Sequence, residues 1–298
     1  MNSTLDRRHF LKTTSALAAG AAAAHLQPGL LAAAEKVRSS SPSAAKIGWR
    51  VGVAQYTFRR FSLYEALDIM VELGIECIEP GFFLALDKSK KLQANENVSA
   101  AARKEWKQRM DDRGIVMASF YSSLGADQKQ ARKIFEFCKE MGVTAIVAEP
   151  PAPAFDMIEK LCDEYAINVT IHNHPGPKSG YWEPEKVLAA CKGRGKRIGA
   201  CCDTGHWVRS GLNVVECLKK LEGRILGFHL KDVIEKGKPE ARDVPLGEGK
   251  ADYAAVLKEL KRQNYQGVLA IEYEHDSPAL KDDVAKCVAF VENTAKTF

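Results

Sequence analysis

Carboxylate and imidazole side chains follow five successive apolar segments in the second half of the sequence. Each segment is short, β-branched and almost continuously apolar. The polar residues at their ends are Glu149, His172 and His174, Asp203 and His206, His229 and Lys231, and Glu272 and Glu274. A buried carboxylate is costly unless it is paired or bound to a cation, so several of them together indicate an ion. Nitrogen and oxygen donors without thiolate suit Mn, Mg, Zn, Co or Fe(II). We therefore predict one divalent metal ion, with Mn²⁺ the first expectation.

The elements that position these side chains repeat eight times along the sequence. Predicted strands cover residues 50–56, 75–79, 115–119, 144–149, 168–172, 198–203, 225–231 and 267–272. Amphipathic segments such as 62–74, 127–142 and 253–264 lie between them, with apolar residues at i, i+3, i+4 and i+7. Gly74, Gly114 and Gly142 follow such segments and are typical of helix ends. This alternation predicts a single (β/α)8 barrel, whose active site forms at the carboxyl ends of the strands.

An open, doubly wound α/β sheet is the alternative fold. Such a sheet commonly carries a glycine-rich turn after its first strand. Here the first strand runs into Gln55, Tyr56 and Thr57 instead, and no such turn is present. The sequence therefore favours the closed barrel and gives no sign of a second domain.

Composition excludes several classes of protein. Of the 298 residues, 46% are hydrophobic and 27% are charged, which argues against disorder, collagen and coiled coil. The net charge is +5 without any block of five like charges, so we expect no nucleic-acid partner. The eight cysteines are scattered without a C-x-x-C pair, which predicts buried free thiols and no structural zinc site.

The amino terminus has the layout of an export signal. Residues 6–12 read DRRHFLK, an alanine-rich run follows from Thr13 to Leu26, and small residues stand at 32–34. The RRxFLK core resembles a twin-arginine signal, which implies export of the folded protein to the periplasm. A membrane anchor is the alternative, but the apolar run is too short and alanine-rich for a stable span. We predict a signal over residues 1–34, a flexible linker over 35–46 and the barrel over 47–298.

Three short stretches carry a resemblance to a known family. CDTGHW (202–207), HLKD (229–232) and IEYE (271–274) resemble the xylose isomerase-like TIM-barrel superfamily of sugar isomerases and epimerases. The resemblance implies a divalent metal held by Glu, Asp, His and Glu, and Asp203, His229 and Glu272 match the last three. The family usually places its first Glu at the end of strand five, where this chain has His172 and His174. The nearest carboxylate is Glu149, so we predict Glu149 as the first ligand, with either histidine as the alternative.

Further site residues are predicted from their positions near the strand ends. Proton transfer is assigned to Glu149, Glu272, His172 and His174. Substrate binding is assigned to His206, Lys231, Gln55, Glu79 and Trp207.

A metal that chelates a ketone and an adjacent hydroxyl stabilises the enediolate formed when a base removes the intervening proton. We therefore expect a sugar isomerase or epimerase first. A lyase, either a keto-inositol dehydratase or a 3-keto-glycoside β-eliminase, is the alternative, and a non-catalytic sugar-binding barrel is a third. A DNA-repair endonuclease of the same superfamily does not suit the small net charge. The expected partner is a small sugar or keto-sugar, and barrels of this kind also form homodimers.

Overall fold

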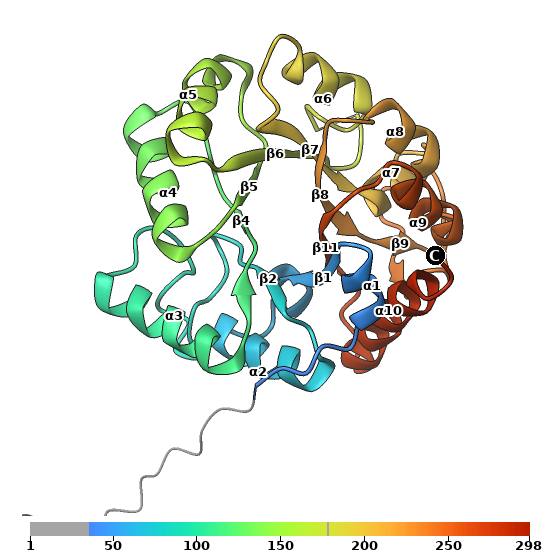
Figure 1. The fold of residues 1–298 in the computed structure, drawn as a ribbon, viewed down its shortest axis with the longest axis horizontal. Helices are drawn as coiled ribbons and strands as arrows, with labels where there is room; N and C mark the ends of the chain where they lie inside the picture. The colour runs from blue at the N-terminus through green and yellow to red at the C-terminus, as the bar shows by residue number, and fades with distance from the viewer. Residues whose placement is uncertain (1–35, 178) are drawn as a thin grey trace, which may run out of the picture. The chain divides into compact units, whose positions relative to one another are not determined.

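The computed structural model describes residues 36–177 and 179–298, and the predicted export signal lies outside them. Strands form a ring, and helices surround it (Figure 1). The ring contains β1 (Trp49–Ala54), β2 (Cys77–Glu79), β3 (Val116–Met117), β4 (Ser119–Tyr121), β5 (Ala145–Ala148), β6 (Asn168–His172), β7 (Ile198–Asp203), β8 (Ile225–Leu230) and β11 (Gly267–Ile271). The helices are α1 (Pro42–Lys46), α2 (Leu63–Leu73), α3 (Ala100–Arg113), α4 (Gln128–Met141), α5 (Phe155–Tyr165), α6 (Pro184–Cys191), α7 (Thr204–Arg209), α8 (Val214–Lys220), α9 (Tyr253–Arg262) and α10 (Leu280–Ala295).

The strands are parallel and follow the order β3-β2-β1-β11-β8-β7-β6-β5-β4. Only Ala118 separates β3 from β4, and the two pair with β2 and β5 respectively. They therefore act as one strand that closes the ring, which confirms the predicted (β/α)8 barrel. This strand extends to Tyr121, two residues beyond its predicted end.

Local sequence signals set the helix boundaries. Ser62 caps α2 in a capping box with Glu65, and Asp127 caps α4 through the backbone N–H of Gln130. The predicted terminators are confirmed as left-handed C-cap residues at Gly74, Gly114 and Gly142, which have φ of 68°, 68° and 79°.

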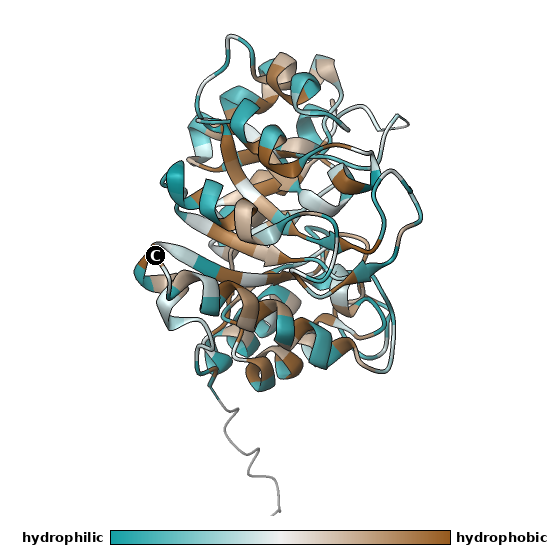
Figure 2. Cartoon of the chain, turned by 90° about the vertical axis from the view of Figure 1, so that its right-hand side faces the viewer, coloured by the Kyte–Doolittle hydropathy of each residue, from teal (hydrophilic) through white to brown (hydrophobic). Residues whose placement is uncertain are grey.

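The core occupies two layers, inside the ring and between the ring and the helices. All residues of β7 are buried, as expected for a strand covered on both faces. Figure 2 shows mostly hydrophobic strands inside and hydrophilic residues on the outer helix faces. All eight cysteines are buried free thiols, which confirms that prediction.

Residues 36–46, predicted as a flexible linker, lie against the barrel. The backbone N–H groups of Ser43 and Ala44 in α1 donate to the carboxylate of Glu292, at 2.8 and 3.1 Å. Ala44 is fully buried. Composition did not reveal this docking because the capping carboxylate lies 249 positions further along the chain.

In the described part of the chain, no helix combines the length and apolar character needed to cross a membrane.

Candidate metal centre

Four buried donor atoms converge at the carboxyl ends of β6, β7, β8 and β11. They belong to His172, Asp203, His229 and Glu272, and one donor atom from each lies within 4.8 Å of the others. These residues are between 0% and 8% exposed. The parallel register places Asp203 opposite His229. We call these residues the four-donor centre.

Asp203 serves two purposes through its two oxygens. Its Oδ1 accepts a hydrogen bond of 2.7 Å from the backbone N–H of His206 and so caps α7. Its backbone groups exchange hydrogen bonds of 2.9 Å with the side-chain amide of Asn173. These contacts hold Asp203 rigid and leave Oδ2 facing the other donors.

The four-donor centre concentrates buried polar atoms that lack hydrogen bonds. Among the described residues, seven buried side-chain N or O atoms have no hydrogen-bond partner, and four of them are both ring nitrogens of His172, Asp203 Oδ2 and His229 Nδ1. Native proteins rarely leave such atoms unsatisfied, so their concentration at one point indicates a ligand-binding site. Lys231 Nζ does lie 3.1 Å from Asp203 Oδ2, but as an ion pair without hydrogen-bond geometry.

The distances suit a metal ion. His229 Nδ1 lies 3.2 Å from Glu272 Oε2 and 3.9 Å from Asp203 Oδ2, and His172 Nε2 lies 3.6 Å from the same Asp203 oxygen. Donors held about 2.1 Å from one ion are at most about 4.2 Å apart. The residues present therefore fit a divalent metal.

Charge also favours a divalent ion. The fully buried Lys231 Nζ lies 3.1 Å from Asp203 Oδ2, 2.8 Å from Glu272 Oε2 and 2.9 Å from Glu274 Oε1. Burial lowers the pKa of Lys231, but the carboxylates, Asp203 first, outweigh burial and hold that pKa well above its usual value. Glu274 is also paired with Arg209, so the carboxylates of Asp203 and Glu272 share the Lys231 ammonium, and the surplus negative charge in this buried site favours a bound cation.

Glu79 orients His229. Glu79 Oε1 lies 2.7 Å from His229 Nε2, and its other oxygen accepts a hydrogen bond from Ser119. A carboxylate on the far ring nitrogen is the usual support for a metal-binding histidine. Burial lowers the pKa of His229, but Glu272 and Glu79 raise it well above its usual value. Glu79, predicted to bind substrate, also lines the adjoining cavity.

Glu149 lies outside the four-donor centre, in a second cluster nearer the surface. Its Oε1 is 2.7 Å from His174 Nδ1 and 3.8 Å from His172 Nδ1. Tyr121 Oη donates to the same oxygen at 3.1 Å. Burial raises the pKa of Glu149, but the neighbouring imidazoles of His172 and His174 outweigh burial and bring the pKa well below its usual value. The geometry thus places His172, not Glu149, beside the three matching ligands.

His206 and Lys231, both predicted to bind substrate, belong to a buried ionic network. His206 Nδ1 lies 3.2 Å from the Arg209 guanidinium. Arg209 donates to Asp243 at 2.6 Å and to Glu274 at 2.7 Å, and Glu274 contacts Lys231. Sequence reasoning missed Arg209 and Asp243, because no strand-end pattern marks them.

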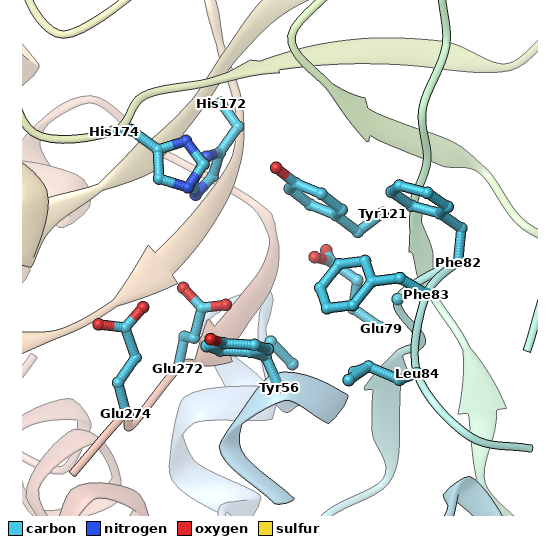
Figure 3. A pocket seen from close by; sticks show the side chains of 12 residues that line it. Tyr56, Glu79, Phe82, Phe83, Leu84, Tyr121, His172, His174, Glu272 and Glu274 are labelled. Atoms are coloured by element: carbon cyan, nitrogen blue, oxygen red, sulfur yellow. The ribbon is translucent and has the colours of Figure 1, made fainter. Parts of the chain in front are cut away.

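A cavity of about 500 Å³ adjoins the four-donor centre. Figure 3 shows His172, His174, Glu272 and Glu274 on one side of it. Phe82, Phe83 and Tyr121 lie on the other side, and Tyr56, drawn beside Glu272, contacts Phe83; these four residues form an aromatic wall. The aromatic wall was not predicted. Phe82 and Phe83 closely follow the end of β2, and this position at a strand end could have indicated that they line the site.

Four of the five predicted substrate-binding residues, His206, Lys231, Gln55 and Trp207, do not line this cavity. Gln55 donates to the carbonyl of Ala85 at 3.0 Å and accepts from the N–H of Gly81 at 3.4 Å, because it begins a 3-10 turn (Gln55–Phe58) directed at that loop. Trp207 is 1% exposed and packs in the hydrophobic core. Gln55 therefore positions the loop after β2, and Trp207 is part of the core.

Part of the chain is similar in sequence to curated proteins. An inosose dehydratase from Clostridium botulinum (strain Alaska E43 / Type E3) is 43% identical over 141 residues, which are 42% of this chain and 46% of that protein. The chain thus spans about half the length of the curated relatives it matches.

Solved structures match over most of the barrel. An uncharacterised protein from Parabacteroides distasonis ATCC 8503 is 31% identical with a TM-score of 0.66, over 83% of this chain and 99% of that one. The IolI protein, solved with a zinc atom, is 19% identical with a TM-score of 0.61, over 83% and 95% of the two chains, and this likeness shows the fold alone. The family model described as xylose isomerase-like TIM barrel matches residues 67–293. This match covers most of the chain, which therefore belongs to the xylose isomerase-like TIM barrel family.

Proposed function

We propose that this protein is a divalent-metal-dependent lyase that eliminates a leaving group from a keto sugar or keto-cyclitol. The observation that carries the proposal is the convergence of His172, Asp203, His229 and Glu272 beside a cavity of about 500 Å³. The relatives named inosose dehydratase favour a lyase over an isomerase, because dehydration is an elimination with water as the leaving molecule.

The four-donor centre would hold the metal, with Glu79 keeping His229 in place. When bound, the ion would act as a Lewis acid that polarises the substrate ketone. Two imidazoles among the donors make Mg²⁺ a poor fit and suit Mn²⁺, Zn²⁺, Co²⁺ or Fe²⁺, of which we expect Mn²⁺. Lys231 would hold the carboxylates of Asp203 and Glu272 in place through its ion pairs with both.

The elimination needs no oxidant or reductant. A base removes the proton from the carbon next to the ketone, and that electron pair forms a double bond to the neighbouring β carbon. The bond from the β carbon to the leaving oxygen breaks, its electrons stay on that oxygen, and the oxygen takes up a proton. The products are a conjugated enone and an alcohol or water.

The chain's proton-transfer groups would be the Glu149–His174 pair and Glu272. His174 is 44% exposed in its side chain and lines the cavity, so it can exchange protons with solvent between turnovers. The 2.7 Å contact with Glu149 fixes the orientation of the His174 ring.

A direct assay tests the lyase. Mn²⁺-loaded protein is mixed with a 3-keto-glucoside, and near-ultraviolet absorbance of the enone is followed together with release of the alcohol. Asp203→Asn should lose both signals with its metal, whereas Glu216→Gln, a matched carboxylate change on the exposed face of α8, should keep them. Full activity of metal-free Asp203→Asn would refute the assignment.

An isomerase or epimerase, the first expectation from the sequence, is the second candidate because it begins with the same proton removal. The Glu149–His174 pair and Glu272 are two proton-transfer groups beside one cavity, which is what a proton return to a different carbon or face requires. In deuterium oxide it would introduce label next to the carbonyl of an isomeric sugar and release no alcohol. Sugar binding without either outcome would indicate a non-catalytic barrel.

We also propose export of the folded protein through the twin-arginine-like segment. Replacing Arg7 and Arg8 by lysine keeps the charge and should abolish recovery of the protein in the periplasmic fraction. Unchanged fractionation would contradict this proposal.

A further inference from the structure

The two sides of the cavity differ in chemistry. The side bearing the four-donor centre is charged, whereas the aromatic wall presents mainly aromatic rings and has hydroxyl groups only on Tyr56 and Tyr121 (Figure 3). Phe82, Phe83 and Leu84 have no side-chain hydrogen-bonding group. A keto sugar or cyclitol carries hydroxyl groups around its ring, and those facing Phe82, Phe83 and Leu84 would lose hydrogen bonds to water without replacement.

The aromatic wall is built as a unit. The rings of Phe82 and Tyr121 are parallel, with an interplanar angle of 8° and a centroid separation of 6.4 Å. Phe83 meets Phe82, Tyr121 and Tyr56 edge-on, at 5.2, 6.3 and 5.9 Å. Such ring geometries stabilise a cluster beyond the area they bury.

Backbone contacts hold the wall in place before any ligand binds. The N–H of Phe82 donates to the carbonyl of Tyr121 at 3.0 Å. Gln55 fastens the same loop through Gly81 and Ala85, which gives this buried residue a positioning role. A preformed apolar surface binds a flat apolar group without the cost of ordering a loop.

Phe83 is nevertheless 42% exposed at the cavity. An exposed aromatic ring within a larger apolar patch is typical of a binding surface.

The aromatic wall is close enough to the four-donor centre for a single ligand to contact both. The ring centroids of Tyr121 and His172 are 5.6 Å apart. A group attached to a sugar ring at the centre would therefore reach the wall directly. The cavity of about 500 Å³ is in the range that takes drug-sized ligands, whereas a lone keto-cyclitol has only about a dozen non-hydrogen atoms.

We infer that the substrate is a keto-glycoside with an aromatic leaving group. Its keto-sugar ring lies at the four-donor centre, and its aromatic aglycone stacks on the aromatic wall. This inference rests on the proposed lyase function. The bond that breaks joins the sugar carbon to the aglycone oxygen, and the aglycone departs as an alcohol after taking up a proton.

The test compares two substrates whose leaving alcohols have similar acidity, the benzyl and methyl 3-keto-glucosides. Because their chemical reactivity is matched, the ratio of their kcat/KM values reports contact with the wall. We expect wild-type protein to favour the benzyl substrate by about tenfold or more. Phe83→Ala should lower this ratio by about tenfold.

Phe298→Ala is the matched control. Phe298 is 41% exposed and packs on Trp49 at the start of β1, at the opposite end of the barrel from the cavity. This variant should leave the ratio unchanged. An equal ratio for wild type and Phe83→Ala, or a preference for a disaccharide over the benzyl substrate, would overturn the inference.

A binding measurement separates failure of this inference from failure of the lyase. If neither keto-glucoside reacts, the lyase is refuted. Calorimetry with the unreactive benzyl and methyl glucosides then measures whether the aromatic wall binds an aromatic group. Tighter, Phe83-dependent binding of the benzyl compound would still support an aromatic ligand there. Equal binding of both compounds would refute that as well.

Discussion

The identity of the first metal ligand can be decided by two matched substitutions, His172→Gln and Glu149→Gln. Both residues become the same neutral amide, and both contact the same cluster. His172 Nε2 lies 3.6 Å from Asp203 Oδ2, whereas Glu149 approaches only the opposite ring nitrogen of His172, at 3.8 Å. We expect His172 to bind the ion and Glu149 to support it from outside.

The expected rise in Tm follows from the linkage between metal binding and folding. A ligand at a hundred times its Kd stabilises the folded state by about 2.7 kcal/mol. For a domain of this size, that free energy corresponds to a rise in Tm of roughly 5–10 °C. Loss of a direct ligand should weaken binding at least about a hundredfold, which leaves about 0.4 kcal/mol at the same metal concentration. Loss of an outer partner should weaken it about tenfold, which leaves about 1.4 kcal/mol.

The assay is thermal unfolding of each protein with and without Mn²⁺, so that every variant is its own reference. Wild type should show the full rise in Tm, Glu149→Gln about half of it, and His172→Gln almost none. His172→Glu should recover part of the shift, because a carboxylate at this position can again bind the ion. A full shift in His172→Gln together with none in Glu149→Gln would refute the geometric reasoning and restore Glu149 as the ligand.

Three further predictions follow from single contacts. Glu79→Gln should weaken metal affinity by about 10–100-fold in chelator competition, because it removes the charge that orients His229, whereas Ser119→Ala should have a smaller effect. Gly205→Ala should displace Lys231, whose side chain a new Cβ would overlap, and destabilise the protein by about 1–3 kcal/mol in denaturant unfolding. Gly180→Ala, where a Cβ meets nothing within 4 Å, should be silent in the same experiment. Glu292→Gln should cost about 1 kcal/mol at neutral pH, because its carboxylate accepts from the backbone of α1. Burial raises the pKa of Glu292, but its hydrogen bonds from Ser43 and Ala44 lower it overall, so this stabilisation is complete above pH 4.5 and is lost as the pH falls through the folded-state value. A difference in unfolding free energy between wild type and Glu292→Gln that does not shrink at acid pH would contradict the stabilising role of the Glu292 carboxylate.

Several features were predictable because their signals are local. A strand buried on both faces is apolar along its length, so β6, β7 and β11 were recognisable as short apolar runs. Polar residues closing such runs stand out, which is why Asp203 and Glu272 were identified. The third strand was predicted too short, because the apolar run was taken to end at the polar Ser119, whereas the strand continues to Tyr121.

Other features depend on contacts between distant segments. Glu149 and His172 both close predicted strands, and nothing in their spacing shows which one faces Asp203. Gln55 was expected at the substrate, but a 3-10 turn directs its amide to the loop after β2. The docking of α1 depends on a carboxylate from the last helix.

The residues alone therefore established an eightfold alternation of strand and helix, and a set of metal-binding side chains at the strand ends. Both follow from the alternation of side chains along a strand and the periodicity of a helix, which act over a few residues. Only the closed barrel decided which donors meet at one point, that Lys231 lies among three carboxylates, and that an aromatic wall faces them. The reason is that strand register, ring closure and loop path bring together residues that no short stretch of sequence relates.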